Sequence, residues 1–258
     1  MSDKIFHPAR EAHEIFEASR LTGDATLEDL ESIRHSTSVY VYQAPVRIWH
    51  WVNALAITVL CVTGYLIGRP LPTMQIAEAY DQFVMGYVRF AHFAAAMILT
   101  VGFFGRIYWA FVGNSHARQM FYVPIFNPRF WRELLWELRW YMFLEKHPKK
   151  YVGHNPLAHV AMFCFMTLGL TFMIGTGWAL YAEGAGQGSL PDTAMGWLLG
   201  LVQNSQRLHT LHHLGMWAIV IFMIIHIYAA IREDIMSRQS MVSTMISGHR
   251  MFKDDRID

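Results

Sequence analysis

Six of the chain's 14 histidines stand inside long apolar stretches, where an ionisable side chain is costly and usually serves a function. Neutral imidazole binds transition metals and can relay protons, so these residues are candidates for metal binding or proton transfer. Two of them, His212 and His226, are 14 residues apart, which is close to four turns of an α-helix and about 21 Å along its axis. Helical phase therefore places these two on one face and turns His213 away from it. The six are His50, His92, His159, His212, His213 and His226.

Four apolar segments carry these histidines, and each is long enough to cross a lipid bilayer as a helix, which takes about 20 residues. They cover residues 48–68, about 90–112, about 157–182 and about 211–231. Hydrophobic residues make up 53% of the 258 residues and charged residues 16%, well below the roughly 25% of soluble domains. A net charge of +1 argues against a nucleic-acid partner, and two cysteines exclude a disulfide scaffold. The sequence therefore predicts an all-α membrane protein built as a four-transmembrane-helix bundle.

Lysine and arginine are concentrated before the first segment, between the second and the third, and after the fourth. This distribution is typical of cytoplasmic loops, so both termini are expected to be cytoplasmic. With this orientation His50 and His226 lie near the cytoplasmic side, and His92 and His212 lie near the outer side. The sequence thus predicts two histidine pairs at two depths of the membrane.

Two imidazoles at each depth suit haem, because haem iron accepts two axial histidines. Zinc or copper would need three or four ligands at one depth. The chain has no C-x-x-C-H motif, so two non-covalent b-type haems are expected. A haem-free membrane anchor with histidines that relay protons is the alternative. Arg47, less than one turn before His50, is a candidate partner of a haem propionate, although an interfacial arginine that reaches the headgroups would look the same.

The rest of the chain is organised around these segments. Residues 1–40 are polar and acidic with no signal-peptide core, and are expected to form a cytoplasmic arm with some helical character. Residues 41–250 are the predicted four-helix di-haem domain, and residues 251–258 are a cytoplasmic tail. Residues 127–146 mix Trp and Leu with Arg and Glu at helical spacing, as a helix in the cytoplasmic interface would. Residues 191–204 are predicted to form a short amphipathic helix on the outer side.

Several short motifs in these segments belong together. Residues 44–51 (APVRIWHW) open the first segment and residues 63–65 (TGY) lie within it. Residues 85–87 (MGY) and 89–92 (RFAH) open the second segment, and residues 106–114 (RIYWAFVGN) close it. Residues 153–156 (GHNP) precede the third, and His212, residues 214–217 (LGMW), 226–228 (HIY) and 232–236 (REDIM) mark the fourth. From about residue 40 to 250 the chain resembles the b-type cytochrome subunits of membrane-bound nickel–iron uptake hydrogenases, which are related to the di-haem cytochrome b subunits of formate dehydrogenases.

This resemblance implies a di-haem cytochrome in the bacterial inner membrane, with His50, His92, His212 and His226 as the axial ligands. It implies that the chain anchors the small and large hydrogenase subunits on the periplasmic face and carries out no H2 chemistry itself. Electrons would pass from the iron–sulfur clusters through the two haems to a membrane quinone. Another periplasmic dehydrogenase is the alternative partner.

The resemblance does not settle the quinone site. Position alone suggests a site near the cytoplasmic haem, at His154, Asn155 and His159. Helix capping is the other role open to Asn155, because asparagine is a strong N-cap residue.

Overall fold

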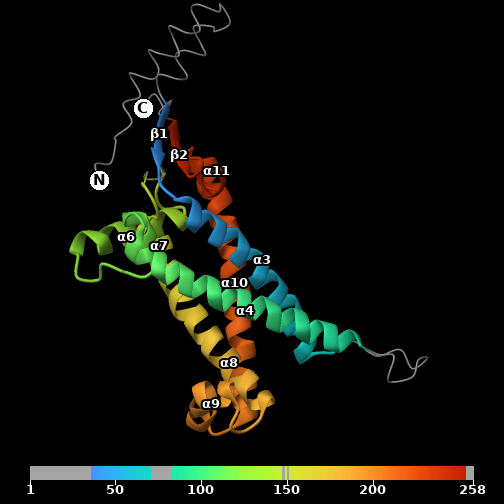
Figure 1. Ribbon diagram of the computed structural model, residues 1–258. Coiled ribbons are helices and arrows are strands. Elements are labelled where there is room, and N and C mark those ends of the chain that lie inside the picture. The colour runs from blue at the N-terminus through green and yellow to red at the C-terminus, as the bar shows by residue number, and fades with distance from the viewer. Residues whose placement is uncertain (1–35, 71–82, 147–148, 150, 254–258) are drawn as a thin grey trace, which may run out of the picture. The chain divides into compact units, whose positions relative to one another are not determined.

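The computed structural model describes residues 36–70, 83–146, 149 and 151–253 (Figure 1). Four of its helical segments are long and apolar enough to cross a membrane: Ala44–Gly68, Val84–Val112, Pro156–Ala185 and Ser205–Ser237. The fold is therefore the mostly helical, multi-pass membrane fold that the sequence predicts. Residues 1–35, to which some helical character was attributed, lie outside the described residues.

The elements follow one another in a simple order. The first membrane helix is α3 (Ala44–Gly68), the second is α4 (Val84–Val112), and the fourth is α10 (Ser205–Ser237). The third is made of α7 (Pro156–Met162), the π-helix η2 (Phe163–Gly169) and α8 (Leu170–Ala185). The shorter elements are β1 (Ser36–Tyr40), α5 (Ser115–Arg118), α6 (Pro128–Tyr141), α9 (Leu190–Val202), α11 (Met241–Ser247) and β2 (His249–Lys253).

The two short helices predicted outside the membrane segments begin at recognisable caps. The Asn127 side chain accepts a hydrogen bond from the Arg129 backbone at 3.0 Å, and Pro128 follows at the first position of α6. The Ser189 hydroxyl accepts from the Asp192 backbone at 3.3 Å at the start of α9. These caps explain why both helices start within one or two residues of their predicted positions.

The π-helix interrupts the third membrane helix at its middle. A π turn holds one residue more than an α turn, is rare, and is often found next to functional sites. The Thr167 hydroxyl in this turn donates to the Met120 carbonyl at 2.6 Å. The turn thereby fastens the third membrane helix to the segment that follows the second.

Residues 48–124 and 158–226 form one compact unit. Its core is made of large apolar side chains from all four membrane helices and from Met120. Many other apolar side chains of these helices point outward, with Phe111 77% and Val101 73% exposed. An outward apolar surface of this kind is what helices need when their outer faces meet lipid. The core residues are Ile57, Leu99, Phe103, Met120, Met166, Leu170, Ile219 and Phe222.

The described residues within 36–47, 125–157 and 227–253 form the other compact unit, and its strands were not predicted. β1 pairs with β2 in an antiparallel sheet, with Tyr40 opposite His249 (Figure 1). Gly248 ends α11 at φ +86°, and its carbonyl accepts from the backbone of Val41 at 2.8 Å. A Cβ at this glycine would lie 2.7 Å from the Tyr42 carbonyl oxygen, so no larger residue fits the turn.

Candidate functional site

The first histidine pair joins α3 and α10. The ring centroids of His50 and His226 are 6.3 Å apart and their planes are tilted by 54°. Phe222, one turn earlier on α10, stacks on His226 at 5.5 Å. Two imidazoles bonded to one metal atom from opposite sides, each at about 2 Å, have centroids about 6 Å apart. The observed separation therefore suits two axial ligands of a single iron.

The second pair, His92 on α4 and His212 on α10, is held by hydroxyl groups. The Thr63 hydroxyl of α3 lies 2.9 Å from Nδ1 of His92, and the Thr176 hydroxyl of α8 lies 2.8 Å from Nδ1 of His212. Both threonines are buried. All four membrane helices thus contribute to this pair.

Two glycines make room for the second pair. A Cβ built on Gly64 would lie 3.3 Å from Cε1 of His92, and a Cβ on Gly177 would lie 3.2 Å from Cε1 of His212. Both distances are shorter than ordinary van der Waals contact. Glycine at these positions therefore lets each imidazole approach the backbone of the neighbouring helix.

The two other membrane histidines have different partners. His213 accepts a hydrogen bond from Trp217 Nε1 at 3.2 Å, within α10. His159 hydrogen-bonds through Nε2 to the Tyr122 carbonyl. Nowhere in the described part of the chain do three or more His, Cys, Asp or Glu side chains gather as a metal cluster. The contact between His50 and His226 offers two imidazoles, which matches the donor set of haem better than that of a zinc or copper centre.

The remaining candidate residues lie outside these pairs. Arg47 donates through Nη1 to the Ile246 carbonyl, at the end of α11. His154 lies with its Nδ1 3.4 Å from the Tyr42 hydroxyl. Asn155 directly precedes α7 and is 5% exposed, and its amide donates to Glu137 at 3.3 Å. Of the three predicted quinone residues, His154 and Asn155 belong to the unit that contains the sheet, and His159 belongs to the other.

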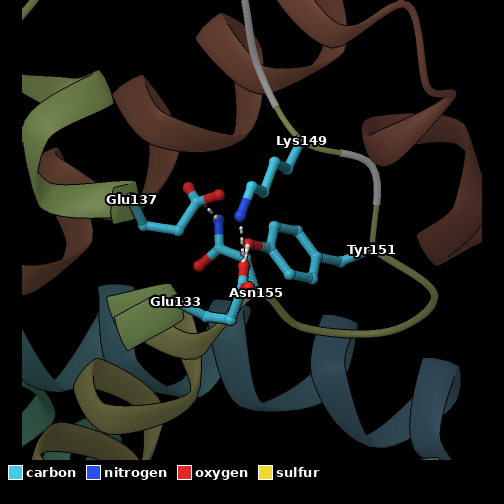
Figure 2. A network of polar contacts seen from close by, with 5 residues as sticks. All are labelled: Glu133, Glu137, Lys149, Tyr151 and Asn155. Atoms are coloured by element: carbon cyan, nitrogen blue, oxygen red, sulfur yellow. Dashed lines mark hydrogen bonds and ion pairs between the residues drawn. The ribbon is translucent and has the colours of Figure 1, made fainter. Parts of the chain in front are cut away.

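Sequence analysis missed a polar network on α6, shown in Figure 2. The Glu133 carboxylate accepts from Lys149 at 2.8 Å and from the Tyr151 hydroxyl at 2.9 Å. Glu137, one turn later, is 1% exposed and accepts from Asn155. This helix was predicted to lie in the interface, and neither acid was singled out. The only sequence signal was their spacing of four residues, which places them on one helix face.

The pKa values of the two acids in this network are shifted in opposite directions. Burial, reinforced by the nearby Glu233 carboxylate, raises the pKa of Glu137 to about 7. Hydrogen bonds from Lys149 and Tyr151 lower the pKa of Glu133. Glu137 is therefore protonated in the folded protein under mildly acidic conditions in which Glu133 is ionised.

The raised pKa of Glu137 predicts that the protein loses stability as the pH rises. Between pH 4.5 and about 7 the folded protein holds a proton that the unfolded chain has released, so its free energy of unfolding falls through this window. The full effect is roughly 3 kcal/mol, because one pKa unit corresponds to about 1.4 kcal/mol. The variant Glu137→Gln is uncharged at every pH. We expect its thermal midpoint to fall less than that of the wild type between pH 5 and pH 8.

Glu133→Gln is the matched control for this experiment. Its pKa is lowered, so Glu133 stays ionised over the whole range. Its replacement should leave most of the wild-type slope in place, because the Glu133 charge is the smallest of the effects on the pKa of Glu137. Parallel curves for the wild type and Glu137→Gln would show that Glu137 does not take up a proton on folding.

Comparison with known proteins agrees with this picture of the molecule. The model of the family described as prokaryotic cytochrome b561 matches residues 41–248. A probable Ni/Fe-hydrogenase B-type cytochrome subunit of Rhodobacter capsulatus is 77% identical over 256 residues, or 99% of this chain and 98% of the relative. A protein of the same description from Azotobacter chroococcum mcd 1 is 60% identical over 94% of this chain and 99% of its own length. A probable Ni/Fe-hydrogenase 1 B-type cytochrome subunit of Escherichia coli K12 is 46% identical over 85% of this chain and 94% of its own length.

Proposed function

This chain belongs to the prokaryotic cytochrome b561 family, and on that premise we propose that it is the di-haem b-type cytochrome of a Ni/Fe-hydrogenase complex. It anchors the hydrogenase on the periplasmic face of the bacterial inner membrane and passes the electrons of H2 oxidation to a membrane quinone. The observation that carries the proposal is the presence of two histidine pairs on the membrane helices. Haem supplies a one-electron carrier at each pair.

Each pair is built to supply neutral imidazole nitrogens to one iron. His50 and His226 stand at a ring separation that suits a shared metal atom. His92 and His212 are oriented by buried threonines and given room by Gly64 and Gly177. Because His212 and His226 are 14 residues apart on α10, the pairs lie at depths that differ by about 21 Å. The distance supports a role in moving electrons across most of a bilayer whose apolar core is about 30 Å thick.

The proposed orientation puts both termini in the cytoplasm and the His92–His212 pair on the hydrogenase side. It rests on the distribution of lysine and arginine, which are concentrated in the two terminal segments and in residues 113–155. Arg47 is proposed to contact a haem propionate. Its Nη1 holds the Ile246 carbonyl, while its buried Nε has no hydrogen-bond partner among the described residues.

Quinone is proposed to react near the His50–His226 pair, with His154, Asn155 and His159 as the candidate contacts. Imidazole and amide groups can donate hydrogen bonds to a quinone carbonyl. The amide of Asn155 is already directed at Glu137, and His154 stands beside the Tyr42 hydroxyl. Asn155 is buried whereas His154 is partly exposed, which supports His154 as the donor and Asn155 as a residue that shapes its surroundings.

Haem content and the reduction of haem by H2 test the proposed function directly. The purified complex of this chain with its hydrogenase subunits is expected to contain two haem b per chain, measured as the pyridine haemochrome. Hydrogen should reduce both haems, and an added quinone should reoxidise them. A complex without a Soret band would contradict the haem proposal. Two haems that H2 cannot reduce would contradict the hydrogenase partner.

A further inference from the structure

The same dipeptide, threonine followed by glycine, holds each histidine of the second pair. Thr63 and Gly64 of α3 meet His92, and Thr176 and Gly177 of α8 meet His212. In each case the threonine hydroxyl contacts Nδ1 and the glycine leaves space for Cε1. Two helices that are far apart in sequence thus present the same two-residue arrangement to two different imidazoles. We call each arrangement, Thr63–Gly64 and Thr176–Gly177, a cradle.

The direction of the two hydrogen bonds follows from the second partner of each hydroxyl. A hydroxyl has one proton to donate. Thr63 directs its hydroxyl to the Val59 carbonyl at 2.6 Å, and Thr176 directs its own to the Phe172 carbonyl at 2.8 Å. The remaining contact can be a hydrogen bond only if the imidazole Nδ1–H donates to the threonine oxygen. Both imidazoles therefore carry their proton on Nδ1 and leave the Nε2 lone pair free.

The first pair has a different environment. Nδ1 of His50 is buried and has no hydrogen-bond partner among the residues that the structure describes. Its ring contacts are with Trp51, edge to face at 5.1 Å, and with His226. A hydrogen bond from Nδ1–H makes an imidazole a stronger donor to a metal, and such bonds to an axial ligand are one means by which proteins tune haem potentials. The two pairs therefore differ in the strength of the ligands that they offer.

We propose that the Thr63–Gly64 and Thr176–Gly177 cradles fix the tautomer of His92 and His212, and thereby lower the redox potential of the haem that these two histidines bind. This inference rests on the proposed function, since it concerns one of the two proposed haem sites. A stronger imidazole donor stabilises ferric iron relative to ferrous iron, so the potential falls. An electron that leaves this site for the His50–His226 site then moves to the higher potential, in the direction of the quinone.

The test is redox potentiometry of the intact hydrogenase–cytochrome complex with each hydroxyl removed. Thr63→Val and Thr176→Val are expected to shift one of the two midpoint potentials to a more positive value and to leave the other in place. Thr63→Ser and Thr176→Ser restore a hydroxyl and should return the potential to that of the wild type. If valine disturbs the packing, Thr63→Ala and Thr176→Ala remove the hydroxyl without adding a methyl group beside Nδ1.

Two threonines of the same helices serve as matched controls. Thr58 of α3 and Thr171 of α8 each lie five residues before a cradle threonine, are exposed, and donate to the backbone carbonyl four residues earlier in the chain. Thr58→Val and Thr171→Val should leave both potentials unchanged.

The outcomes separate this inference from the proposed function. A change at one haem that serine reverses and the controls lack, whether a positive shift or a loss of that haem, supports the cradles. Two bound haems with unmoved potentials in the valine and alanine variants would overturn the inference and leave the proposed function intact. A change that serine does not reverse would also overturn it. A wild-type complex without haem would instead overturn the proposed function.

Discussion

Replacing His212 with alanine is expected to remove one of the two haems from each chain, whereas replacing His213 with alanine leaves both in place. The adjacent residues differ in helical phase and in surroundings. The Thr176 hydroxyl lies 2.8 Å from Nδ1 of His212, whereas His213 accepts a hydrogen bond from Trp217. An iron that loses one of two axial imidazoles loses the bond that fixes it to α10. The haem content per chain, measured on the purified complex, should fall by about half in His212→Ala.

The pair of variants contains its own control. Both lie on α10 and both lose one imidazole, so a general effect on folding or insertion would appear in both. Equal haem loss from His212→Ala and His213→Ala would show that helical phase does not select the ligand. Quinone reduction by H2 should fail in His212→Ala and remain in His213→Ala, which gives a second, independent measurement.

Replacing Arg106 with alanine is expected to destabilise the protein by about 4 kcal/mol, which would be the largest change in stability predicted for this chain. Arg106 is 4% exposed near the end of α4, and its Nη2 donates to the Ala117 carbonyl at 2.7 Å. The guanidinium also lies 5.6 Å from the Trp49 ring centroid and 5.4 Å from that of Phe121. Alanine leaves the buried carbonyl without this donor and removes both cation–π contacts.

Unfolding in a denaturing-detergent titration measures this loss. Arg118→Ala, on the neighbouring α5, removes an exposed arginine and should change the unfolding free energy by less than about 0.5 kcal/mol. Arg106→Lys keeps the charge but not the planar group that lies over two rings, so an intermediate value is expected. If Arg106→Ala unfolds at the same detergent fraction as Arg118→Ala, the buried guanidinium does not stabilise the fold.

The membrane helices were predictable because length and lack of charge are local properties of a sequence. The C-terminal ends of the first two, Gly68 and Val112, were predicted correctly, but both ends of the fourth were not. The fourth segment was predicted over residues 211–231, but α10 runs from Ser205 to Ser237. The helix continues past the apolar residues into Arg207 at one end and Glu233 at the other, because its backbone hydrogen bonds do not require apolar side chains. An apolar window measures the part of a helix that suits lipid rather than the whole helix.

Depth and helical phase single out the four candidate ligands, and this assignment stays a prediction, whereas the hydrogen bonds of His92 and His212 could not be predicted. Phase within α10 selects His212 over His213 without reference to any other helix. The Thr176 hydroxyl comes from α8, and nothing in the sequence near His212 indicates it. The repeated Thr-Gly dipeptide at 63–64 and 176–177 was the available signal, and it has meaning only when the two helices are placed beside the histidines. For the same reason the burial of Glu137 was missed, since residues 149–155 supply its partners.

The small sheet of β1 and β2 has a consequence for biosynthesis. The ribosome makes β1 before any membrane helix and β2 after the last, and the two strands pair across more than 200 residues of chain. The two strands can pair only when both lie on the same side of the bilayer, because an open sheet edge is not tolerated within lipid. A chain that has inserted an odd number of its helices therefore leaves the strands on opposite sides, and the sheet cannot form. Pairing of the two ends thus distinguishes a chain that has inserted an even number of its helices, such as the complete set of four, from one that has inserted an odd number.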